Sequence, residues 1–495
     1  MEIQVAALKR HFLSLAFFLG LGIAGAWAQT TVPRLEISAL KNAFETYQES
    51  AIKDRRFTHA DLQPLIQKHS VQFGVNPLGK SVLGKSISSL DWGSGQTKVM
   101  LWSQMHGNES TATMALFDLF NFLEGKGDSY DAIRQLLNSQ LQLKFIPMLN
   151  PDGADAFKRR NALDIDLNRD AISLISPEAV VLKKARDDFE PEFGFNLHDQ
   201  QIYYNVVNTP KQATISLLAP AYNKATEINE VRGRAMQTIA SMNQLLQALI
   251  PGQVGKYDDA FEPRAFGDNI QKWGTSTILI ESGGLLGDPE KQEVRKINFM
   301  LLLDALYTIA TRGYTQYTTE QYFAIPDNGI QLMDLVIQEM QVPVNGTWYP
   351  VDLGIRRREI EGKAGYSFAG SVEDLGDMQV FFGLETLDAT GLQYKEGKVY
   401  PTPFETVKEV SVEKAMELLG QGYLAIQVKK DTARALHGLP LVVLKSATSY
   451  SGGWTTGATP NFFLTKDGKY EYALVNGYLI DLDRIPKEKF RNRIY

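Results

Sequence analysis

The sequence predicts an α/β first part, in which helices cover a sheet, and a smaller, strand-rich second part. Up to about residue 310, short apolar segments alternate with longer amphipathic ones, a pattern typical of strands and helices packed in layers. After Tyr314, paired alternating segments are separated by Asn-Gly or Asp-Gly turns. Because 495 residues exceed one ordinary core, we expect two domains, residues 29–313 and residues 314–495.

The elements of the first part follow from the spacing of its apolar residues. Residues 35–52 and 62–69 are helix-like, and residues 74–95 are rich in turn formers. The predicted strands span residues 99–102, 141–147, 193–197, 202–207 and 277–280. The predicted helices span residues 110–123, 177–189, 220–249 and 289–310. The last helix has Asp288 as its expected N-cap and Pro289 at its first position.

The elements of the second part are predicted from its turns. Asn345-Gly346, Asp467-Gly468 and Asn476-Gly477 each separate two alternating segments, which indicates β-hairpins. A helix-like segment, residues 412–420, interrupts the strands. The residues of this part indicate no function.

The N-terminal segment is typical of a secretory signal peptide. Lys9-Arg10-His11 precedes an apolar run, residues 12–24, and Ala26-Trp27-Ala28 matches the small-residue cleavage pattern. We therefore predict a signal peptide at residues 1–28. A membrane anchor is the alternative, but the apolar run is shorter than the roughly 20 residues of a spanning helix. No later run is long enough to span a bilayer, so we expect an exported, soluble protein.

Composition narrows the function and the compartment. The net charge of −6 and the pI near 5.7 argue against a nucleic-acid partner. The chain has no cysteine, which excludes disulfides and thiol chemistry. Asn108 and Asn345 match the N-glycosylation pattern, but a glycan on Asn108 would cover the candidate site described next. We therefore expect a bacterial secreted or periplasmic location.

A candidate metal site begins at His106 and Glu109, which directly follow the predicted strand 99–102. A catalytic zinc site needs three protein ligands and an open position for water, and imidazole and carboxylate are suitable ligands. His198, which follows the predicted strand 193–197, supplies the third ligand. A lone His-x-x-Glu arises readily by chance and a single buried histidine is usually structural, so the site depends on further residues.

Two other histidines are not candidate metal ligands. His59 and His69 have no partner at ligand spacing, and we interpret both as structural.

Polar residues suited to binding a substrate carboxylate and polarising a carbonyl lie between Glu109 and His198 in the sequence. Arg159 and Arg169 are ten positions apart, with Asn168 beside the second. Arginine binds carboxylates through paired hydrogen bonds and can polarise a carbonyl; a solvated charge run is the alternative interpretation. Glu281 ends the apolar run 276–280 and precedes Ser282 and two glycines, a suitable place for a general base acting on a metal-bound water.

One combination of these motifs is specific, although each motif is weak. In chain order it comprises His106-x-x-Glu109, Asn150-Pro-Asp-Gly153, Arg159-x-Asn161, Asp166-Leu-Asn168-Arg169, His198 and Glu281. Over about residues 55–313 the combination resembles the M14 family of zinc metallocarboxypeptidases. The resemblance implies an α/β/α fold with a mixed sheet of about eight strands.

The resemblance also implies a metal centre. His106, Glu109 and His198 would bind one zinc ion per chain. Asp166 would orient His106, as the second partner of a zinc-binding histidine commonly does.

Catalytic and binding roles are implied in the same way. Arg159 would polarise the scissile carbonyl and stabilise the oxyanion, and Asn168 and Arg169 would bind the terminal carboxylate of the peptide. Glu281 would act as general base toward a zinc-activated water and then as proton donor.

The implied function is zinc-dependent hydrolysis of the C-terminal peptide bond of a peptide with a free carboxylate. Two alternatives stay open. One is a zinc amidase or deacylase acting on cell-wall peptides or acylated amino acids, and the other is a non-catalytic peptide-binding protein. The second fits less well because the ligands, Arg159 and Glu281 are all present.

Some positions depart from the family pattern. Tyr257 lies near the position of the mobile tyrosine of the digestive members, and we assign it no role. Asp199 follows His198 where a small hydroxyl residue is common, and we hypothesise that it makes the site more negative and favours a polar or basic substrate. The residues that shape the side-chain pocket are expected between Lys256 and Trp273.

Overall fold

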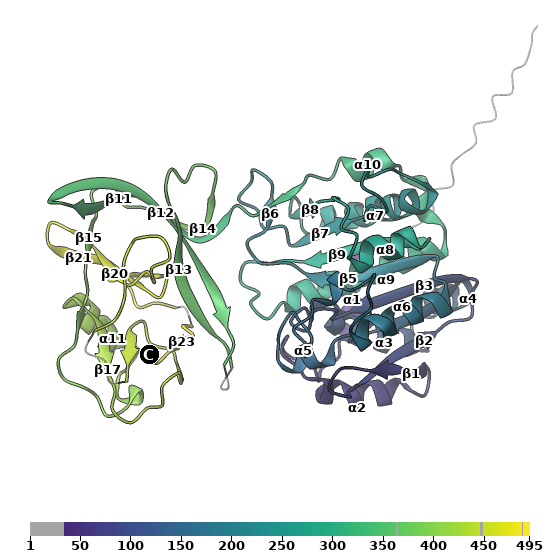
Figure 1. The fold of residues 1–495 in the computed structure, drawn as a ribbon, viewed down its shortest axis with the longest axis horizontal. Coiled ribbons are helices and arrows are strands. Elements are labelled where there is room, and N and C mark those ends of the chain that lie inside the picture. Colours follow the sequence, from purple (N-terminus) through teal and green to yellow (C-terminus); the bar gives the residue numbers. More distant parts are fainter. Residues whose placement is uncertain (1–33, 363–364, 446–448, 488) are drawn as a thin grey trace, which may run out of the picture. The chain divides into compact units, whose positions relative to one another are not determined.

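The first part of the chain is built on a mixed sheet of eight strands in the order β1-β2-β4-β3-β5-β9-β7-β8 (Figure 1). The computed structural model describes residues 34–362, 365–445, 449–487 and 489–495, so the predicted signal peptide, residues 1–28, lies outside the described residues. The strands of this sheet are β1 (Gly74–Lys80), β2 (Ser86–Trp92), β3 (Thr97–Ser103), β4 (Leu141–Ile146), β5 (Phe193–Asp199), β7 (Ile215–Leu218), β8 (Val254–Lys256) and β9 (Ser276–Ser282). Neighbouring strands β4, β3, β5 and β9 are parallel, whereas β1, β2 and β7 join antiparallel neighbours.

Helices cover both faces of this sheet, and the residues of β3 show why. Val99 and Leu101 belong to one buried cluster, and Met100 and Trp102 belong to another, because alternate side chains of a strand point to opposite faces. Residues of α1, α2, α3, α4, α7 and α9 complete the first cluster, and residues of α6 and α8 complete the second. The predicted α/β/α class with a mixed sheet of about eight strands is confirmed.

The helices of the first part have the following bounds: α1 (Ile37–Tyr47), α2 (His59–His69), α3 (Thr111–Glu124), α4 (Asp131–Gln140), α5 (Pro151–Asp155), α6 (Pro177–Phe189), α7 (Glu230–Leu249), α8 (Phe266–Lys272), α9 (Gln292–Ala310) and α10 (Thr319–Phe323). Two short 3-10 helices, η1 (Leu167–Arg169) and η2 (Gly313–Gln316), accompany them.

The carboxyl ends of β3, β5 and β9 lie at one edge of the sheet because these strands are parallel neighbours. His106 follows β3, His198 lies in β5, and Glu281 lies in β9. His198 and Glu281 are register partners. Ligands of open α/β sheets bind at such an edge, so the fold itself gathers the predicted site.

The predicted strand 202–207 is mostly wrong. Only Asn205–Val206 forms a strand, β6, and it pairs with β10 (Asn328–Gly329) outside the main sheet. Conversely, β1, β2, β7 and β8 belong to the sheet but were not predicted.

Two predicted helices begin later than expected. Helix α7 begins at Glu230 rather than at residue 220, because the fully buried guanidinium of Arg232 donates to the carbonyls of Ala219 and Glu227 and holds the preceding segment as a loop. Helix α9 begins at Gln292 rather than at residue 289, because Lys291 adopts a left-handed conformation with φ 52°.

Lys291 occupies the N-cap position of α9, not Asp288, but the side chain of Asp288 accepts hydrogen bonds from the first turn of the helix. Its carboxylate accepts the backbone N–H groups of residues 292, 293 and 294 at 2.7–3.0 Å.

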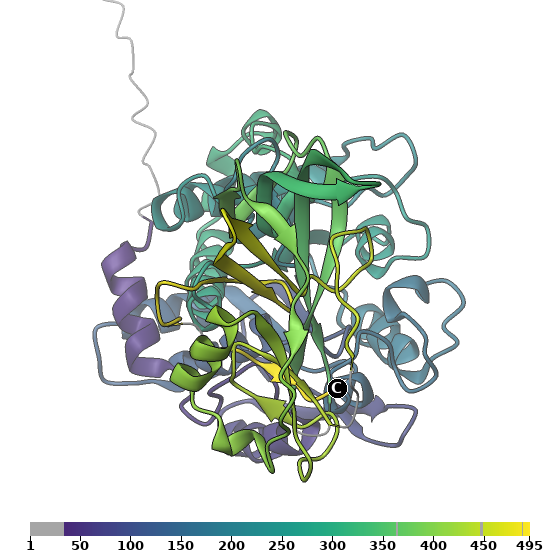
Figure 2. The same ribbon diagram turned by 90° about the vertical axis from the view of Figure 1, so that its left-hand side faces the viewer.

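A second sheet of eight strands forms most of the second part. Its order is β13-β12-β11-β15-β20-β21-β22, with β14 also paired to β11, and β11, β12 and β13 run side by side (Figure 2). The strands are β11 (Leu332–Val344), β12 (Thr347–Ile360), β13 (Ser367–Gly376), β14 (Phe382–Asp388), β15 (Gln393–Lys395), β20 (Phe462–Lys466), β21 (Lys469–Val475) and β22 (Tyr478–Asp481). The three predicted hairpins are confirmed, since each Asn-Gly or Asp-Gly pair joins two of these strands with positive φ at both residues.

Smaller elements complete the second part. They are β16 (Lys398–Val399), β17 (Tyr423–Gln427), β18 (Leu436–His437), β19 (Val442–Leu444), β23 (Asn492–Arg493) and the 3-10 helix η3 (Val407–Glu409). The predicted helix 412–420 is observed as α11 (Val412–Gly420) and packs on the three-stranded sheet β16-β17-β19. The domain boundary after residue 313 stays a prediction. Among the described residues, no helix has the length and apolar character to cross a bilayer.

Candidate metal centre and active site

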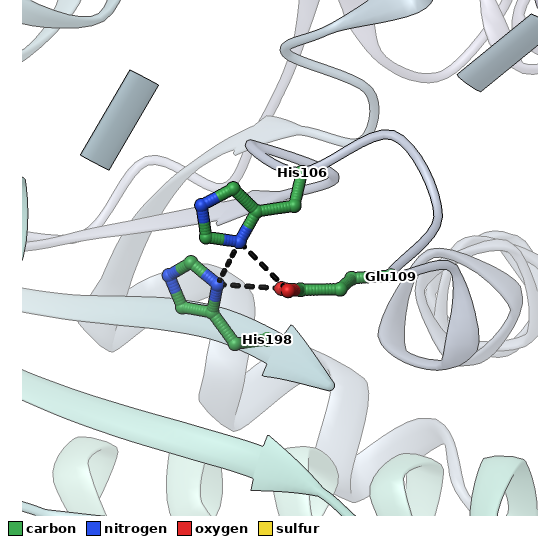
Figure 3. Close-up of side chains that lie close together, drawn as sticks. All are labelled: His106, Glu109 and His198. Carbon is green, nitrogen blue, oxygen red and sulfur yellow. Dashed lines mark hydrogen bonds and ion pairs between the residues drawn. The ribbon is translucent and has the colours of Figure 1, made fainter. Parts of the chain in front are cut away.

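The three predicted metal ligands meet in one buried cluster (Figure 3). The Nδ1 atom of His106 lies 2.7 Å from Oε1 of Glu109, and the Nδ1 atom of His198 lies 2.7 Å from Oε2 of the same carboxylate. The two Nδ1 atoms are 3.2 Å apart. Less than a tenth of each residue is exposed, so the donors face one another without competing solvent.

This donor set fits a zinc ion. Zinc bonds imidazole nitrogen at about 2.0–2.1 Å in tetrahedral sites, which places neighbouring donor atoms about 3.3 Å apart. The observed separations of the donor atoms, 2.7–3.2 Å, are close to this distance. Among the described residues, His106, Glu109 and His198 form the only group of three or more potential ligands within 4.8 Å.

Asp166 fixes the orientation of His106. The Nε2 atom of His106 lies 3.0 Å from Oδ1 of Asp166, which leaves Nδ1 pointing at the cluster. Asp166 is the N-cap of η1, and the same oxygen accepts the backbone N–H of Asn168 at 3.0 Å. The structure therefore places Asp166 where the resemblance implied, beside the first histidine.

The charges of the cluster perturb one another. Burial alone would raise the pKa of Glu109, but the two histidines bring it below its ordinary value. Burial would lower the pKa of His106, but Glu109 and Asp166 raise it overall. For His198 burial dominates, and the pKa is lowered. A neutral imidazole and an ionised carboxylate are the forms that bind metal.

Glu281 lies beside this cluster in a partly buried position. Burial, reinforced by the charges of Glu109 and Asp199, raises its pKa well above the ordinary value, and Arg159 and Lys291 oppose the shift. A carboxylate whose pKa is moved toward neutrality is typical of a general acid–base group.

Arg159 joins the carboxylates of Glu109 and Asp166 from the solvent side of the metal cluster. Its Nη1 donates to Oε1 of Glu109 at 3.0 Å and its Nε donates to Oδ2 of Asp166 at 3.1 Å. The side chain is 45% exposed, so it is anchored by two carboxylates and still open to a ligand.

The predicted carboxylate-binding pair lies next to these residues. The side-chain oxygen of Asn168 accepts the N–H of Phe266, the first residue of α8, at 2.9 Å, so its NH2 group is the donor that could bind an anion. Arg169 is partly exposed and lies 3.4 Å from Glu262. Helix α8 thus lies beside these two residues and within the segment expected to shape the side-chain pocket.

Tyr257, to which the sequence assigned no role, interacts with Glu281. Tyr257 and Tyr204 form an O–H to O–H hydrogen bond of 3.0 Å, and burial together with Glu281 raises the pKa of Tyr257. Tyr257 therefore lies close enough to Glu281 to interact with its charge.

Asp199 is held by contacts within the protein. Its carboxylate accepts the hydroxyl of Thr111 at 2.6 Å and pairs with Nζ of Lys291 at 3.1 Å. The hypothesis that Asp199 makes the site more negative and favours a polar or basic substrate stays a prediction. The charge of Asp199 raises the pKa of Glu281, and Lys291 supplies a nearby counter-charge.

Residues 58–216 match the model of the family described as zinc carboxypeptidase. This segment, about a third of the chain, is similar to that family. The matched segment includes His106, Glu109 and His198 and ends before Glu281. The zinc carboxypeptidase match thus covers the metal cluster.

Similar proteins cover parts of the chain. An uncharacterised protein of Zymomonas mobilis is 30% identical over 132 residues, which are 26% of this chain and 34% of that protein. A carboxypeptidase of Arabidopsis thaliana is 38% identical over 68 residues, 13% of each chain. The chain thus spans about a third of the first relative's length and about an eighth of the second's. A metallo-carboxypeptidase of Burkholderia cenocepacia is 18% identical, with a TM-score of 0.41 over 52% of this chain and 70% of that structure.

Proposed function

We propose that the protein is a zinc-dependent carboxypeptidase that removes residues from the C-terminus of peptides. The observation that carries the proposal is the buried cluster of His106, Glu109 and His198 with Glu281 at the adjacent strand position. A bound zinc would supply Lewis-acid activation of a water molecule and of the scissile carbonyl.

The chain's own residues would divide the remaining work. Glu281 would take the proton of the attacking water and pass it to the leaving amine, a task suited to its raised pKa. Arg159, held by Glu109 and Asp166, would donate to the carbonyl oxygen as negative charge develops there. Pre-positioned donors of this kind need little rearrangement during the reaction.

Recognition of the substrate's end would fall to Asn168 and Arg169. An amide NH2 and a guanidinium are suitable donors for a terminal carboxylate. Because Asn168 is tied to Phe266, the carboxylate would bind beside α8, with the last side chain directed toward that helix.

Product analysis tests the proposal. Zinc-loaded protein is incubated with a mixture of peptides and cell-wall peptides, with and without a chelator, and the products are identified by mass spectrometry. Stepwise loss of C-terminal residues that stops with chelator is expected. A specific amide cut within cell-wall fragments, or equal cleavage of free-acid and C-terminally amidated peptides, would instead favour the amidase or deacylase.

A variant separates catalysis from metal binding. Glu281→Gln should retain zinc but lose at least about 10²-fold in kcat, because the amide cannot take up a proton. Glu192→Gln is the control, since Glu192 is exposed and precedes the other end of β5. Undiminished hydrolysis by Glu281→Gln would remove Glu281 from its proposed role.

Export completes the proposal. The predicted signal peptide would deliver the enzyme to the periplasm or the exterior of a bacterium. N-terminal sequencing of protein recovered outside the cytoplasm should begin at Gln29.

A further inference from the structure

We infer that Lys291 is a positioning residue of the active centre, which holds the general base Glu281 and the ligand Glu109 in place by joining the ends of β5 and β9 to the start of α3. The inference rests on the proposed function for its catalytic consequence. Its consequence for metal binding rests only on the observed cluster.

Lys291 is an unusual lysine. It precedes α9 in a left-handed conformation, with φ 52° and ψ 34°, which costs a non-glycine residue free energy. It is only 6% exposed, although lysine is among the residues least often buried. A strained backbone that directs a charged side chain inward needs a compensating role.

The ammonium group joins two neighbouring strand ends. Nζ donates to the backbone carbonyl of Ser282 at 2.9 Å and pairs with Oδ2 of Asp199 at 3.1 Å. Asp199 and Ser282 are register partners, and each directly follows one of the proposed functional residues, His198 and Glu281. Lys291 therefore fixes the spacing of the strands at the position where the metal cluster meets the general base.

Asp199 extends this connection to Glu109. Its backbone N–H donates to Oε2 of Glu109 at 3.2 Å, and its carboxylate accepts the hydroxyl of Thr111 at 2.6 Å. Thr111 is the first residue of α3 and lies two positions after Glu109. The backbone N–H of Asp199 thus holds the carboxylate of Glu109 directly. The side chain of Asp199 holds Thr111, which follows Glu109 in the chain. Both contacts depend on the orientation of Asp199.

The charge balance also favours Lys291. Glu109, Glu281 and Asp199 are three neighbouring carboxylates, of which Glu109 is buried and the other two are partly buried. Arg159 faces them from the solvent side, where a substrate would bind, whereas Lys291 faces them from within the protein. Substrate binding would therefore leave the counter-charge of Lys291 in place.

The test compares Lys291→Met with Arg295→Met. Arg295 lies four residues along on α9 and forms a fully buried pair with Asp118 of α3. Its other hydrogen bonds are to the carbonyls of Glu49 and Ile52 and to the side chain of Gln292, none of which is a metal ligand. The zinc dissociation constant is measured by competition with a chelator, and kcat and KM are measured separately. Folding is checked by circular dichroism.

Lys291→Met should bind zinc about 10–100-fold more weakly and lose kcat by a similar factor. This is the usual effect of removing a residue that orients metal ligands. KM should change little, because Lys291 does not face the substrate side. Folded Arg295→Met should keep the zinc affinity and kcat of the wild type.

Zinc affinity and kcat within twofold of wild type in Lys291→Met would overturn the inference, as would equal losses in both variants. If Lys291→Met does not fold, the double variant D199N/K291M leaves no unpaired buried charge and is measured against the same expectations. A wild-type protein that binds zinc but cleaves no peptide would refute the proposed function, while the zinc measurement would still decide the role of Lys291.

Discussion

Asp166 connects the residues that bind metal with those that bind substrate. It contacts His106, Arg159 and the backbone of Asn168 within 3.1 Å. A carboxylate that accepts from the outer nitrogen of a metal-binding histidine fixes its tautomer and raises its basicity. One side chain therefore sets both the direction of the ligand and the position of the arginine.

Replacing this carboxylate should weaken the metal site. Asp166→Asn keeps the shape but removes the charge, so zinc affinity should fall about 10–100-fold, as measured by chelator competition. Asp164→Asn is the matched control, because Asp164 is exposed and accepts a hydrogen bond from Arg160 through its backbone carbonyl. Equal zinc affinity in the two variants would contradict the role of Asp166.

The geometry of Arg159 leads to a second expectation. Its Nη1 and Nε atoms contact two different carboxylates, a spacing that the single ammonium of lysine cannot reproduce. Arg159→Lys should therefore lower kcat about 10²-fold or more, since donors to a developing oxyanion are worth this much. Steady-state kinetics check it, and a change confined to KM would assign Arg159 to substrate binding alone.

The sequence predicted the ligands and Asp166 but did not predict Lys291, and the difference has a physical reason. His106, Glu109 and His198 were predictable because imidazole and carboxylate after apolar strands are rare in combination. Lys291 was not, because a lysine near a helix start is usually solvated, and only the tertiary structure shows where its side chain lies.

Among the elements, long apolar strands were predicted better than short or irregular ones. Strands β3, β5 and β9 have central positions and are buried on both faces along most of their length, which gives a short apolar run. Strand β4 is also central, and its first residues alternate between buried and partly exposed, the pattern of a half-buried strand. Strand β1 lies at the sheet edge, contains Pro77 and is irregular between Pro77 and Gly79, so it was interpreted as turn-rich. Strand β8 has only three residues, too few for a periodic pattern.

The hairpin turns allow a controlled test of an element. Gly468 and Gly477 both have φ 81°, but a Cβ on Gly468 would meet nothing within 4 Å. A Cβ on Gly477 would lie 3.0 Å from Ile355 and 3.3 Å from the backbone of Gly370. Gly468→Ala should cost about 1 kcal/mol from backbone strain, whereas Gly477→Ala should cost about 2–4 kcal/mol because crowding is added.

Urea denaturation checks this order of stabilities through the transition midpoints at unchanged m-value. Equal midpoints for the two variants would show that the neighbours of Gly477 relax without cost.

For the whole molecule, buried histidines outside the metal cluster link stability to pH. His437 lies in β18, is 8% exposed, and accepts the N–H of Leu439 at its Nδ1. Burial lowers the pKa of His437 from 6.5 to about 4. Burial also lowers the pKa of His69, against the opposing effect of Glu124, so the two residues act in the same direction.

The sign of the pH dependence follows from these depressed values. Between pH 6.5 and 4 the unfolded chain binds a proton at His437 that the folded chain does not, so stability is complete above pH 6.5 and falls as the pH decreases through this window. The full loss from His437 is about 3 kcal/mol. His437→Asn keeps an acceptor for Leu439 but cannot titrate, so its free energy of unfolding should fall less steeply from pH 6.5 to 4.5 in urea titrations. If the free energy of unfolding of the variant depended on pH as steeply as that of the wild type, His437 would be protonated equally in the folded and unfolded states.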